Sequence, residues 1–139
     1  IHFLMNKYKK ALPGKTIGFH GHNNMQLAFA NTIETIIEGA NMLDGTFLGL
    51  GRGAGNCGTE QLLTFLKNPK YRVKPVLNAI QHEIIPLQKT LSWGYHIPYL
   101  ITGYLNLHPS SAMKFMDSEE RDDIMSFFEH TIDSRKELE

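Results

Sequence analysis

The sequence predicts an α/β fold in which two parallel strands near the N-terminus are followed by a mainly α-helical second half. Two short segments, about 15–22 and 41–50, have the apolar content and the flanking glycines of strands. The segment between them repeats its apolar residues with the period of a helix, and a helix of this length makes the right-handed crossover that joins parallel strands. After residue 73 only helical patterns follow.

Residues 1–12 are predicted as a helix that ends at the turn formed by Pro13 and Gly14. Its apolar residues recur at helical spacing: Phe3, Leu4, Tyr8 and Leu12. The helix begins without a capping residue or a methionine. We therefore expect a piece of a larger protein, although a choice of expression boundary or of numbering would look the same.

The first predicted strand, 15–22, has two unlike faces because side chains in a strand alternate. Ile17 and Phe19 point to one side, which we expect to be packed. Gly18, His20 and His22 point to the other side, where the strand begins with a residue that has no side chain and continues with two polar ones.

The helix after this strand is expected to be capped by Asn23 or Asn24 and to end near Gly39. Its apolar stripe contains Phe29, Ala30, Ile33, Ile36, Ile37 and Ala40. The opposite, polar face contains Asn31, Glu34, Thr35 and Glu38. The pattern is typical of an amphipathic helix.

The second strand, 41–50, leads into the glycine-rich segment "GRGAGNCGT" and then into a helix from Thr59 to about Lys67, which Asn68 and Pro69 stop. Residues 15–67 therefore form a βαβα segment. Parallel sheets are covered on both faces and normally contain more than two strands. We expect this segment to be completed by strands that the sequence does not contain.

The second half is predicted to hold helices at about 74–91, 99–106 and 118–135. Pro75 fits the first turn of the first helix, and Pro86 should kink or break it. Asp117 and Glu120 have the spacing of a capping box for the last helix. The buried stripe of that helix is expected to contain Ile124, Phe128 and Ile132.

Composition and charge narrow the classes of function. Fourteen basic residues balance fourteen acidic ones, and no basic run exceeds two residues, so the footprint of a nucleic-acid binder is missing. No apolar run approaches the length of a membrane span, and the first residues do not have the charge order of a signal peptide. The single cysteine, Cys57, has no partner for an internal disulfide, which favours a reducing, cytoplasmic location.

His20 and His22 stand one residue apart, so on a strand they share a face about 6–7 Å apart at the backbone. Two imidazoles suit a divalent metal when a further ligand, often a carboxylate, completes the set. The alternative is two histidines that hydrogen-bond within a loop and bind nothing. Their position at the carboxyl end of a strand, where α/β proteins place their chemistry, favours the metal. Both interpretations stay open on the residues alone.

The glycine-rich segment matches the GxGxxG spacing at Gly53, Gly55 and Gly58 but lacks the rest of a dinucleotide fingerprint. No second strand ending in an acidic residue follows, and no Lys-Ser or Lys-Thr pair indicates a P-loop. Arg52 offers a cation to a carboxylate ligand, or is a solvated surface charge. Asn56 offers an amide to a metal, or is a turn residue.

Other reactive residues have weaker patterns. Cys57 has no identifiable base and is expected to be a small buried residue rather than a nucleophile. Asp44 is either an orienting neighbour or a paired structural carboxylate. The aromatic residues of the tail are expected in a core or an interface, around Trp93: Tyr95, Tyr99 and Tyr104. The remaining histidines have no partner spacing that distinguishes them from surface residues: His82, His96, His108 and His130.

The long ordered stretch "GFHGHNNMQLAFANTIETIIEGANMLDGTFLGLGRGAGNCGTE" resembles the last two strand-and-helix units of the pyruvate-aldolase and lyase family of metal-dependent TIM barrels. That family contains 4-hydroxy-2-oxovalerate aldolases, hydroxymethylglutaryl-CoA lyases, and isopropylmalate and homocitrate synthases. The tail "WGYHIPYLITGYLNLHP" is similar to the helical C-terminal extension of the 4-hydroxy-2-oxovalerate aldolase branch. The resemblance implies an incomplete barrel in residues 1–70 and a helical extension in 71–139.

By that resemblance, His20 and His22 would be ligands of a divalent ion, usually Mn²⁺ or Mg²⁺, at the barrel mouth. Asn56 falls where some members bring a metal-contacting asparagine. The family completes the site with an aspartate, next to an arginine, from a first-strand motif that this sequence does not contain. Tyr95 or Tyr99 would lie near the aldehyde end of the substrate, and Arg52 remains a candidate for its carboxylate.

The resemblance implies an aldolase that cleaves a 4-hydroxy-2-oxoacid to pyruvate and an aldehyde, with the metal as a Lewis acid for the enolate. Its base and arginine would lie upstream of Ile1, so the 139-residue chain alone is expected to be inactive. One alternative is a lyase or synthase that acts on an acyl-CoA ester. Another is a binding or assembly module whose tail pairs with an acylating aldehyde dehydrogenase. We also expect a homo-oligomer, because apolar strand edges are left uncovered.

Overall fold

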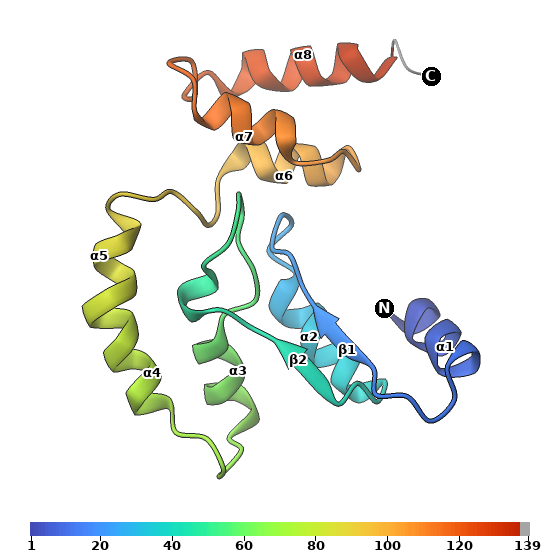
Figure 1. The fold of residues 1–139 in the computed structure, drawn as a ribbon. Helices are drawn as coiled ribbons and strands as arrows, with labels where there is room; N and C mark the ends of the chain where they lie inside the picture. The colour runs from blue at the N-terminus through green and yellow to red at the C-terminus, as the bar shows by residue number, and fades with distance from the viewer. Residues whose placement is uncertain (137–139) are drawn as a thin grey trace.

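The computed structural model describes residues 1–136 (Figure 1). Its elements are, in order, α1 (His2–Ala11), β1 (Gly18–His20), α2 (Ala28–Ile37), β2 (Met42–Asp44), the 3₁₀ turn η1 (Phe47–Gly49), α3 (Thr59–Leu66), α4 (Val73–Ala79), the π turn η2 (Ile80–Ile84), α5 (Ile85–Gln88), α6 (Ile97–Tyr104), α7 (Ser110–Met116) and α8 (Ile124–Lys136). The predicted α/β class, with a short parallel sheet and many helices, is confirmed.

The sheet consists of β1 and β2, which pair in parallel as predicted, with Phe19 opposite Leu43. Both strands are shorter than the predicted ranges 15–22 and 41–50, because the chain leaves the ladder after His20 and Asp44. Beyond these points each strand forms a bridge to the glycine-rich loop, at His22 with Asn56 and at Thr46 with Gly58. The loop therefore continues the hydrogen bonding of the sheet at the carboxyl ends of both strands.

The N-cap position of helix α2 is Leu27, which provides no side-chain cap, so the prediction that Asn23 or Asn24 is the N-cap residue was wrong. The predicted end near Gly39 is confirmed. Asn23 instead binds the first helical amide from the segment before the helix. The Asn23 side-chain oxygen accepts a hydrogen bond from the Ala28 amide at 3.1 Å, and the chain turns at Gly39 with φ of +88°. The predicted polar face was wrong for Thr35, which is fully buried together with Thr32. Each threonine hydroxyl donates to a backbone carbonyl one turn earlier in the helix, so it is satisfied without water.

The helix predicted at 74–91 runs through α4, η2 and α5, and Pro86 perturbs it as expected. Proline lacks an amide hydrogen and its ring crowds the carbonyl four residues earlier. The five-residue π turn η2 lies directly before Ile85 and Pro86, where it widens the helix at the point of crowding. The helix continues to Gln88.

The last helix begins later than predicted, so the capping box of Asp117 and Glu120 was wrong. Residues 117–123 form turns, and a separate helix, α7, precedes them. The cap is Asp123, whose carboxylate accepts a hydrogen bond from the Ser126 amide at 3.1 Å. The buried side of α8 is centred on Phe127 and Thr131, while the predicted Ile124, Phe128 and Ile132 pack partly buried beside them.

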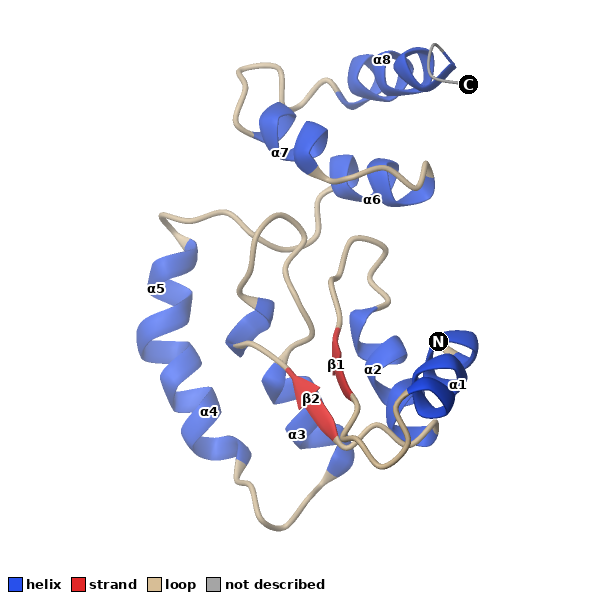
Figure 2. Ribbon diagram, turned by 45° about the vertical axis from the view of Figure 1, so that its right-hand side comes forward, coloured by secondary structure: helices blue, strands red, loops and turns tan. Residues whose placement is uncertain are grey.

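The molecule has two separate hydrophobic cores, one beside the sheet and one among the C-terminal helices. Ala28, Cys57 and Leu62 form a small core between α2, the glycine-rich loop and α3. The second core joins α6, α7 and α8, which gather at one end of the elongated molecule in Figures 1 and 2. Its members are Ala54, Tyr99, Ile101, Leu105, Ala112 and Phe127. Ala54 belongs to the glycine-rich loop, so this loop is part of the helical core as well.

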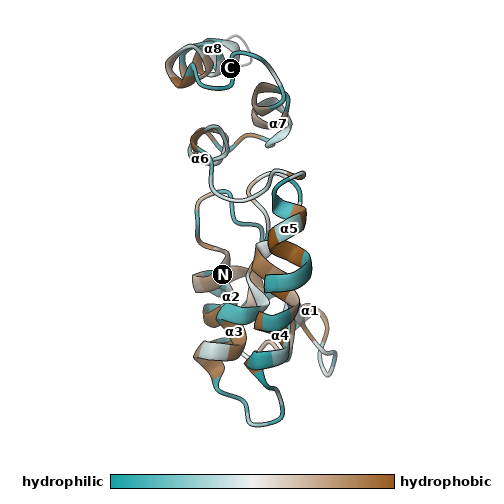
Figure 3. Cartoon of the chain, turned by 90° about the vertical axis from the view of Figure 1, so that its left-hand side faces the viewer, coloured by the Kyte–Doolittle hydropathy of each residue, from teal (hydrophilic) through white to brown (hydrophobic). Residues whose placement is uncertain are grey.

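Large apolar side chains remain exposed on the sheet side of the molecule, among them Phe3 of α1, Ile37 of α2 (71% exposed) and Met42 of β2. Figure 3, coloured by hydropathy, shows apolar and polar residues mixed on the helices of this half. Within residues 1–136, no helix combines the length and the hydropathy needed to cross a bilayer.

Candidate functional site

The first element of the site is the pair formed by His20 and Asp44, which end the two strands and are partners in the parallel register. Nδ1 of His20 lies 3.3 Å from Oδ2 of Asp44, and both side chains are well exposed. A carboxylate on one ring nitrogen fixes the orientation of the imidazole and leaves Nε2 as the nitrogen available to a ligand. Asp44 thus lies in the position of an orienting neighbour.

His22 lies beside His20, with Gly21 between them in the chain. The two imidazole ring centroids are 4.9 Å apart, with the rings inclined at 74°. Gly21 is buried, and a Cβ atom there would lie 2.9 Å from the Phe19 ring and 3.3 Å from the Ala28 carbonyl oxygen. Any side chain at this position would push the segment out of place. The structure therefore brings both predicted histidines to one spot at the carboxyl end of β1.

Asn56 lies opposite His22 in an antiparallel bridge, so the loop folds back along the histidine segment. Its side-chain nitrogen donates to the Leu50 carbonyl at 3.1 Å, close against Gly51. With the nitrogen engaged, the oxygen of the amide is the atom left to accept a hydrogen bond or to approach a cation.

The glycines of the loop serve its own packing. Gly55 has φ of +76°, and a Cβ atom on it would lie 2.2 Å from the Gly49 carbonyl oxygen, inside any permitted contact. The Asn56 amide donates to the same carbonyl at 2.9 Å. The close approach that Gly55 permits is therefore made to the chain's own backbone at Gly49.

Arg52 and Tyr99 line one polar cavity of about 820 Å³ between the loop and α7. Tyr99 is buried, and its ring packs against Gly53, where a Cβ atom would come within 3.1 Å of the ring. Burial raises the pKa of the Tyr99 hydroxyl, and the negative charge of Asp117 raises it further. Tyr99 is thus held neutral on a cavity that the Arg52 cation also lines.

Tyr95 is half exposed and lines a different, smaller cavity with Asn56, of about 210 Å³. Trp93, by contrast, is buried and donates its ring N–H to the Leu48 carbonyl at 3.0 Å. The backbone amide of Gly94 donates to the Gly53 carbonyl at 3.0 Å. The segment before α6 is therefore anchored on the glycine-rich loop, with Tyr99 beside Arg52 and Tyr95 beside Asn56.

Cys57 is buried in the small core, as its sequence context predicted. Burial raises the pKa of its thiol; a hydrogen bond with Thr32 lowers that pKa, and the charge of Glu60 raises it. A thiol with a raised pKa in an apolar core is a poor nucleophile.

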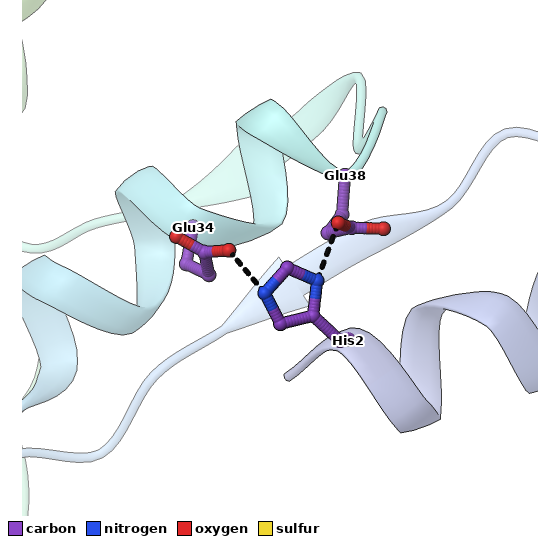
Figure 4. A group of neighbouring side chains, drawn as sticks. All are labelled: His2, Glu34 and Glu38. Carbon is purple, nitrogen blue, oxygen red and sulfur yellow. Dashed lines mark hydrogen bonds and ion pairs between the residues drawn. The ribbon is translucent and has the colours of Figure 1, made fainter.

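A group that the sequence did not reveal links α1 to α2. His2 stands between two carboxylates, with Nε2 at 2.8 Å from Glu34 and Nδ1 at 2.5 Å from Glu38 (Figure 4). The Lys9 ammonium lies 3.7 Å from the other oxygen of Glu38. Both ring nitrogens of His2 and both carboxylates are thus engaged within the group, which joins helices α1 and α2. Helical spacing alone cannot show such a pairing, because its residues are 32 or more positions apart.

His108 is the second residue that sequence reasoning missed. It lines a cavity of about 230 Å³ that also contains His22 and Arg52. In the sequence it had been placed among surface histidines, since nothing near it in the chain suggests a ligand set. Only the folding of the tail over the carboxyl end of β1 brings it there.

The donors at the carboxyl end of the strands fit a divalent cation in type. His20 and His22 offer imidazole nitrogens, Asn56 offers an amide oxygen and Asp44 a carboxylate, which are ligands of transition metals and of Mn²⁺. In the described part of the chain, three ligand atoms of His, Cys, Asp or Glu approach within 4.8 Å of one another at His2, Glu34 and Glu38 only. Among the described residues, the His20 and His22 pair is therefore not part of such a three-ligand cluster.

Comparison with known proteins places the chain in a family. The HMGL-like family model matches residues 1–88, more than half of the chain, and the chain therefore belongs to the HMGL-like family. The 4-hydroxy-2-oxovalerate aldolase of Geobacillus thermodenitrificans is 57% identical over 122 residues, covering 78% of this chain and 34% of the relative. The enzyme of the same name from Pelotomaculum thermopropionicum is 35% identical over 116 residues, covering 82% and 34%.

Two further comparisons agree with this assignment. The oxaloacetate decarboxylase of Mycobacterium tuberculosis is 52% identical over 64 residues, covering 44% of this chain and 19% of the relative. The crystal structure of the N-terminal domain of a candidate aldolase from Bacteroides vulgatus superposes with a TM-score of 0.69 at 32% identity, over 90% of this chain and 44% of that one. The chain thus spans about a third or less of the length of these curated relatives. The predicted resemblance to the aldolase and lyase family is confirmed.

Proposed function

We propose that this chain is part of a divalent-metal-dependent aldolase that cleaves a 4-hydroxy-2-oxoacid to pyruvate and an aldehyde. The observation that carries the proposal is the pair of imidazoles, 4.9 Å apart, at the carboxyl end of a parallel strand, with Asp44 on His20. The names of the relatives from Geobacillus thermodenitrificans and Pelotomaculum thermopropionicum support the substrate class.

In this proposal, residues 1–70 hold the last two βα units of a TIM barrel, whose parallel strands are 15–22 and 41–50, and residues 71–139 are its helical extension. Exposed apolar groups on the sheet side, such as Ile37 and Met42, support an incomplete barrel, because a parallel sheet of two strands leaves both edges open. The remaining strands would come from chain outside these 139 residues, as would the third carboxylate ligand and the catalytic base.

His20, His22 and Asn56 would hold the cation, with Mn²⁺ or Mg²⁺ as the proposed ions. When bound, such an ion supplies Lewis-acid chemistry for cleavage of a carbon–carbon bond near a 2-oxo group. Asp44 holds the His20 ring so that Nε2 faces the ligand. Arg52 offers its guanidinium to the substrate carboxylate, and Tyr99, kept neutral by burial, is a hydrogen-bond donor on the same cavity. Tyr95 is retained as a candidate substrate contact near Asn56.

The test compares the full-length protein that contains this chain with its His20→Ala and His22→Ala variants. Metal content and the rate of pyruvate release from a 4-hydroxy-2-oxoacid are both expected to collapse in each variant. His82→Ala, an exposed histidine on η2, is the matched control and should retain both. Full metal occupancy and activity in both His20 and His22 variants would overturn the proposal.

A second candidate is decarboxylation of a 2-oxoacid, which the Mycobacterium tuberculosis relative favours through its 52% identity over 64 residues. Both reactions release pyruvate, but the second product is an aldehyde for the aldolase and carbon dioxide for the decarboxylase. Release of carbon dioxide from oxaloacetate by the full-length protein, with no aldehyde formed from a 4-hydroxy-2-oxoacid, would select the decarboxylase.

An acylating aldehyde dehydrogenase remains a proposed partner, because it would consume the aldehyde product. Size-exclusion chromatography of the full-length protein with a purified dehydrogenase of this type tests the pairing, and separate elution at micromolar concentrations would count against it. A cytoplasmic location is proposed with it, on the ground that the buried free thiol of Cys57 suits a reducing compartment.

A further inference from the structure

The helical extension reaches the candidate metal site directly. Gly103 of α6 lies against the loop that follows His22, where a Cβ atom would approach the Met25 sulfur to 2.8 Å. The chain then turns at Asn106, which has φ of +56°, and the Leu107 amide donates to the Thr102 carbonyl at 2.8 Å. This turn brings the segment after α6 back over the carboxyl end of β1.

His108 follows this turn, and contacts of the residues before and after it in the chain fix its position. Leu107 packs against the core of the extension, and the Ser110 amide donates to Nδ1 of His108 at 3.2 Å. In a neutral imidazole, an accepting Nδ1 leaves the proton on Nε2. His108 is therefore oriented, and its Nε2–H is the donor that remains for a ligand.

The cavity beside His108 has walls of two kinds. His22, Asn24, Arg52 and His108 supply polar groups, while Pro109 and Met113 supply an apolar side. Its volume, about 230 Å³, lies below the roughly 300–1,000 Å³ typical of pockets for drug-sized ligands, so it suits a small metabolite. A ligand held at His20 and His22 would border this cavity, because His22 forms one of its walls.

We propose that this cavity is the subsite for the part of the substrate beyond its 2-oxo group, and that His108 donates Nε2–H to the 4-hydroxyl. The inference rests on the proposed aldolase function and adds a specificity residue from the extension. Arg52 is suited to the charged carboxylate, and the neutral donor of His108 to the hydroxyl. Pro109 and Met113 face the alkyl part of the aldehyde half.

The test is a binding cycle on the full-length protein, measured by calorimetry without turnover. One ligand is 2,4-dihydroxyvalerate, which keeps the 4-hydroxyl and cannot be cleaved because it lacks the 2-oxo group; the other is 2-hydroxyvalerate, which lacks the 4-hydroxyl. Wild-type protein should prefer the first by about tenfold, the worth of one hydrogen bond of about 1.4 kcal/mol. His108→Ala should lose this preference, and His108→Gln, which keeps a side-chain N–H, should regain part of it.

His130→Ala is the matched control, since His130 is also exposed on the extension, and it should bind like wild type. A second readout is exchange of the pyruvate methyl protons with deuterated water, a reaction with no 4-hydroxyl. Exchange should be unchanged in His108→Ala while kcat/KM for the hydroxy-oxoacid falls about tenfold. If His108→Ala keeps both the exchange reaction and the wild-type ligand preference, the role of His108 alone is overturned. If the wild-type protein shows no exchange, the aldolase proposal is overturned together with it.

Discussion

Nδ1 of His20 lies 3.3 Å from Oδ2 of Asp44, and the two residues are register partners on neighbouring parallel strands. Parallel pairing thus places a carboxylate on one ring nitrogen of an imidazole and leaves the other ring nitrogen available to a ligand. Neither residue needs a flexible loop for this, since each ends a strand of the same sheet.

Replacing Asp44 by Asn should weaken metal binding without unfolding the protein. A carboxylate that accepts a hydrogen bond from a metal-ligating histidine typically contributes about 10–100-fold to metal affinity, because it orients the ring and raises its basicity. We expect a loss in that range in the full-length protein, measured by metal titration, with an unchanged thermal midpoint. Asp133→Asn on α8 is a carboxylate control remote in sequence from the strands. An Asp44→Asn protein with wild-type metal affinity would remove Asp44 from the site.

The thiol of Cys57 should be unreactive in the folded protein. Its pKa is raised above the ordinary value of 9.0, chiefly by burial, so thiolate is scarce at neutral pH and access is blocked. Reaction with an aromatic disulfide reagent at pH 8 is expected to be far slower than for free cysteine and to become fast in denaturant. Equal rates in native and denatured protein would contradict the buried placement.

The same raised pKa predicts a loss of stability in alkali. Because the folded state holds the thiol proton more tightly than the unfolded state, the stabilisation is complete below pH 9.0 and is lost as pH rises through the folded pKa. The free energy of unfolding should therefore decrease above pH 9, and Cys57→Ala should flatten that decrease. Urea unfolding between pH 8 and 11 provides the measurement; identical slopes in both proteins would argue against the shift.

Gly55→Ala should be more destabilising than Gly14→Ala, although the two glycines have nearly equal φ, +76° and +75°. The left-handed conformation costs a side chain roughly 1–2 kcal/mol at either position. At Gly55 a Cβ atom also meets the Gly49 carbonyl oxygen at 2.2 Å, whereas at Gly14 nothing lies within 4 Å. The difference between the two free energies of unfolding isolates that clash. Equal destabilisation would mean that the loop relaxes freely.

The 139-residue polypeptide, produced alone, should self-associate or aggregate. Both strands of the sheet are edge strands, and large apolar side chains are exposed at Met42 of β2, Ile37 of α2 and Phe3 of α1. Sedimentation velocity over a concentration series should show a rising mean mass. A monomer at high concentration would show that the sheet is sufficiently covered by the chain itself.

Local signals in the sequence accounted for much of the fold. The spacing of His20 and His22, the glycine after α2, and Pro86 all act through neighbours in the chain, so their effects could be predicted. The parallel pairing followed from the crossover helix. The start of α8 was predicted too early, because Asp117 and Glu120 have the spacing of a capping box, whereas the structure places the cap at Asp123.

The parts that could not be predicted depend on contacts between distant segments. Thr35 was assigned to a polar face by its position in the helical pattern, whereas its hydroxyl donates to the Thr32 carbonyl of the same helix and its side chain is buried. His108 lines the same cavity as His22 through the turn after α6, and His2 meets Glu34 and Glu38 through the packing of α1. The residues of each contact are far apart in the sequence, so no helical or strand periodicity could have predicted that they meet.

The glycine-rich loop has one consequence for how relatives of this protein can be recombined. Ala54 is buried in the core of α6 and α8, while Gly55 and Asn56 are folded against Gly49 and the histidine segment. A chimera that exchanges the tail at residue 90 would therefore separate Tyr99 from the surface that it fills at Gly53. A chimera joined before Thr46 would transfer the glycine-rich loop and the tail together, with the contacts between them intact.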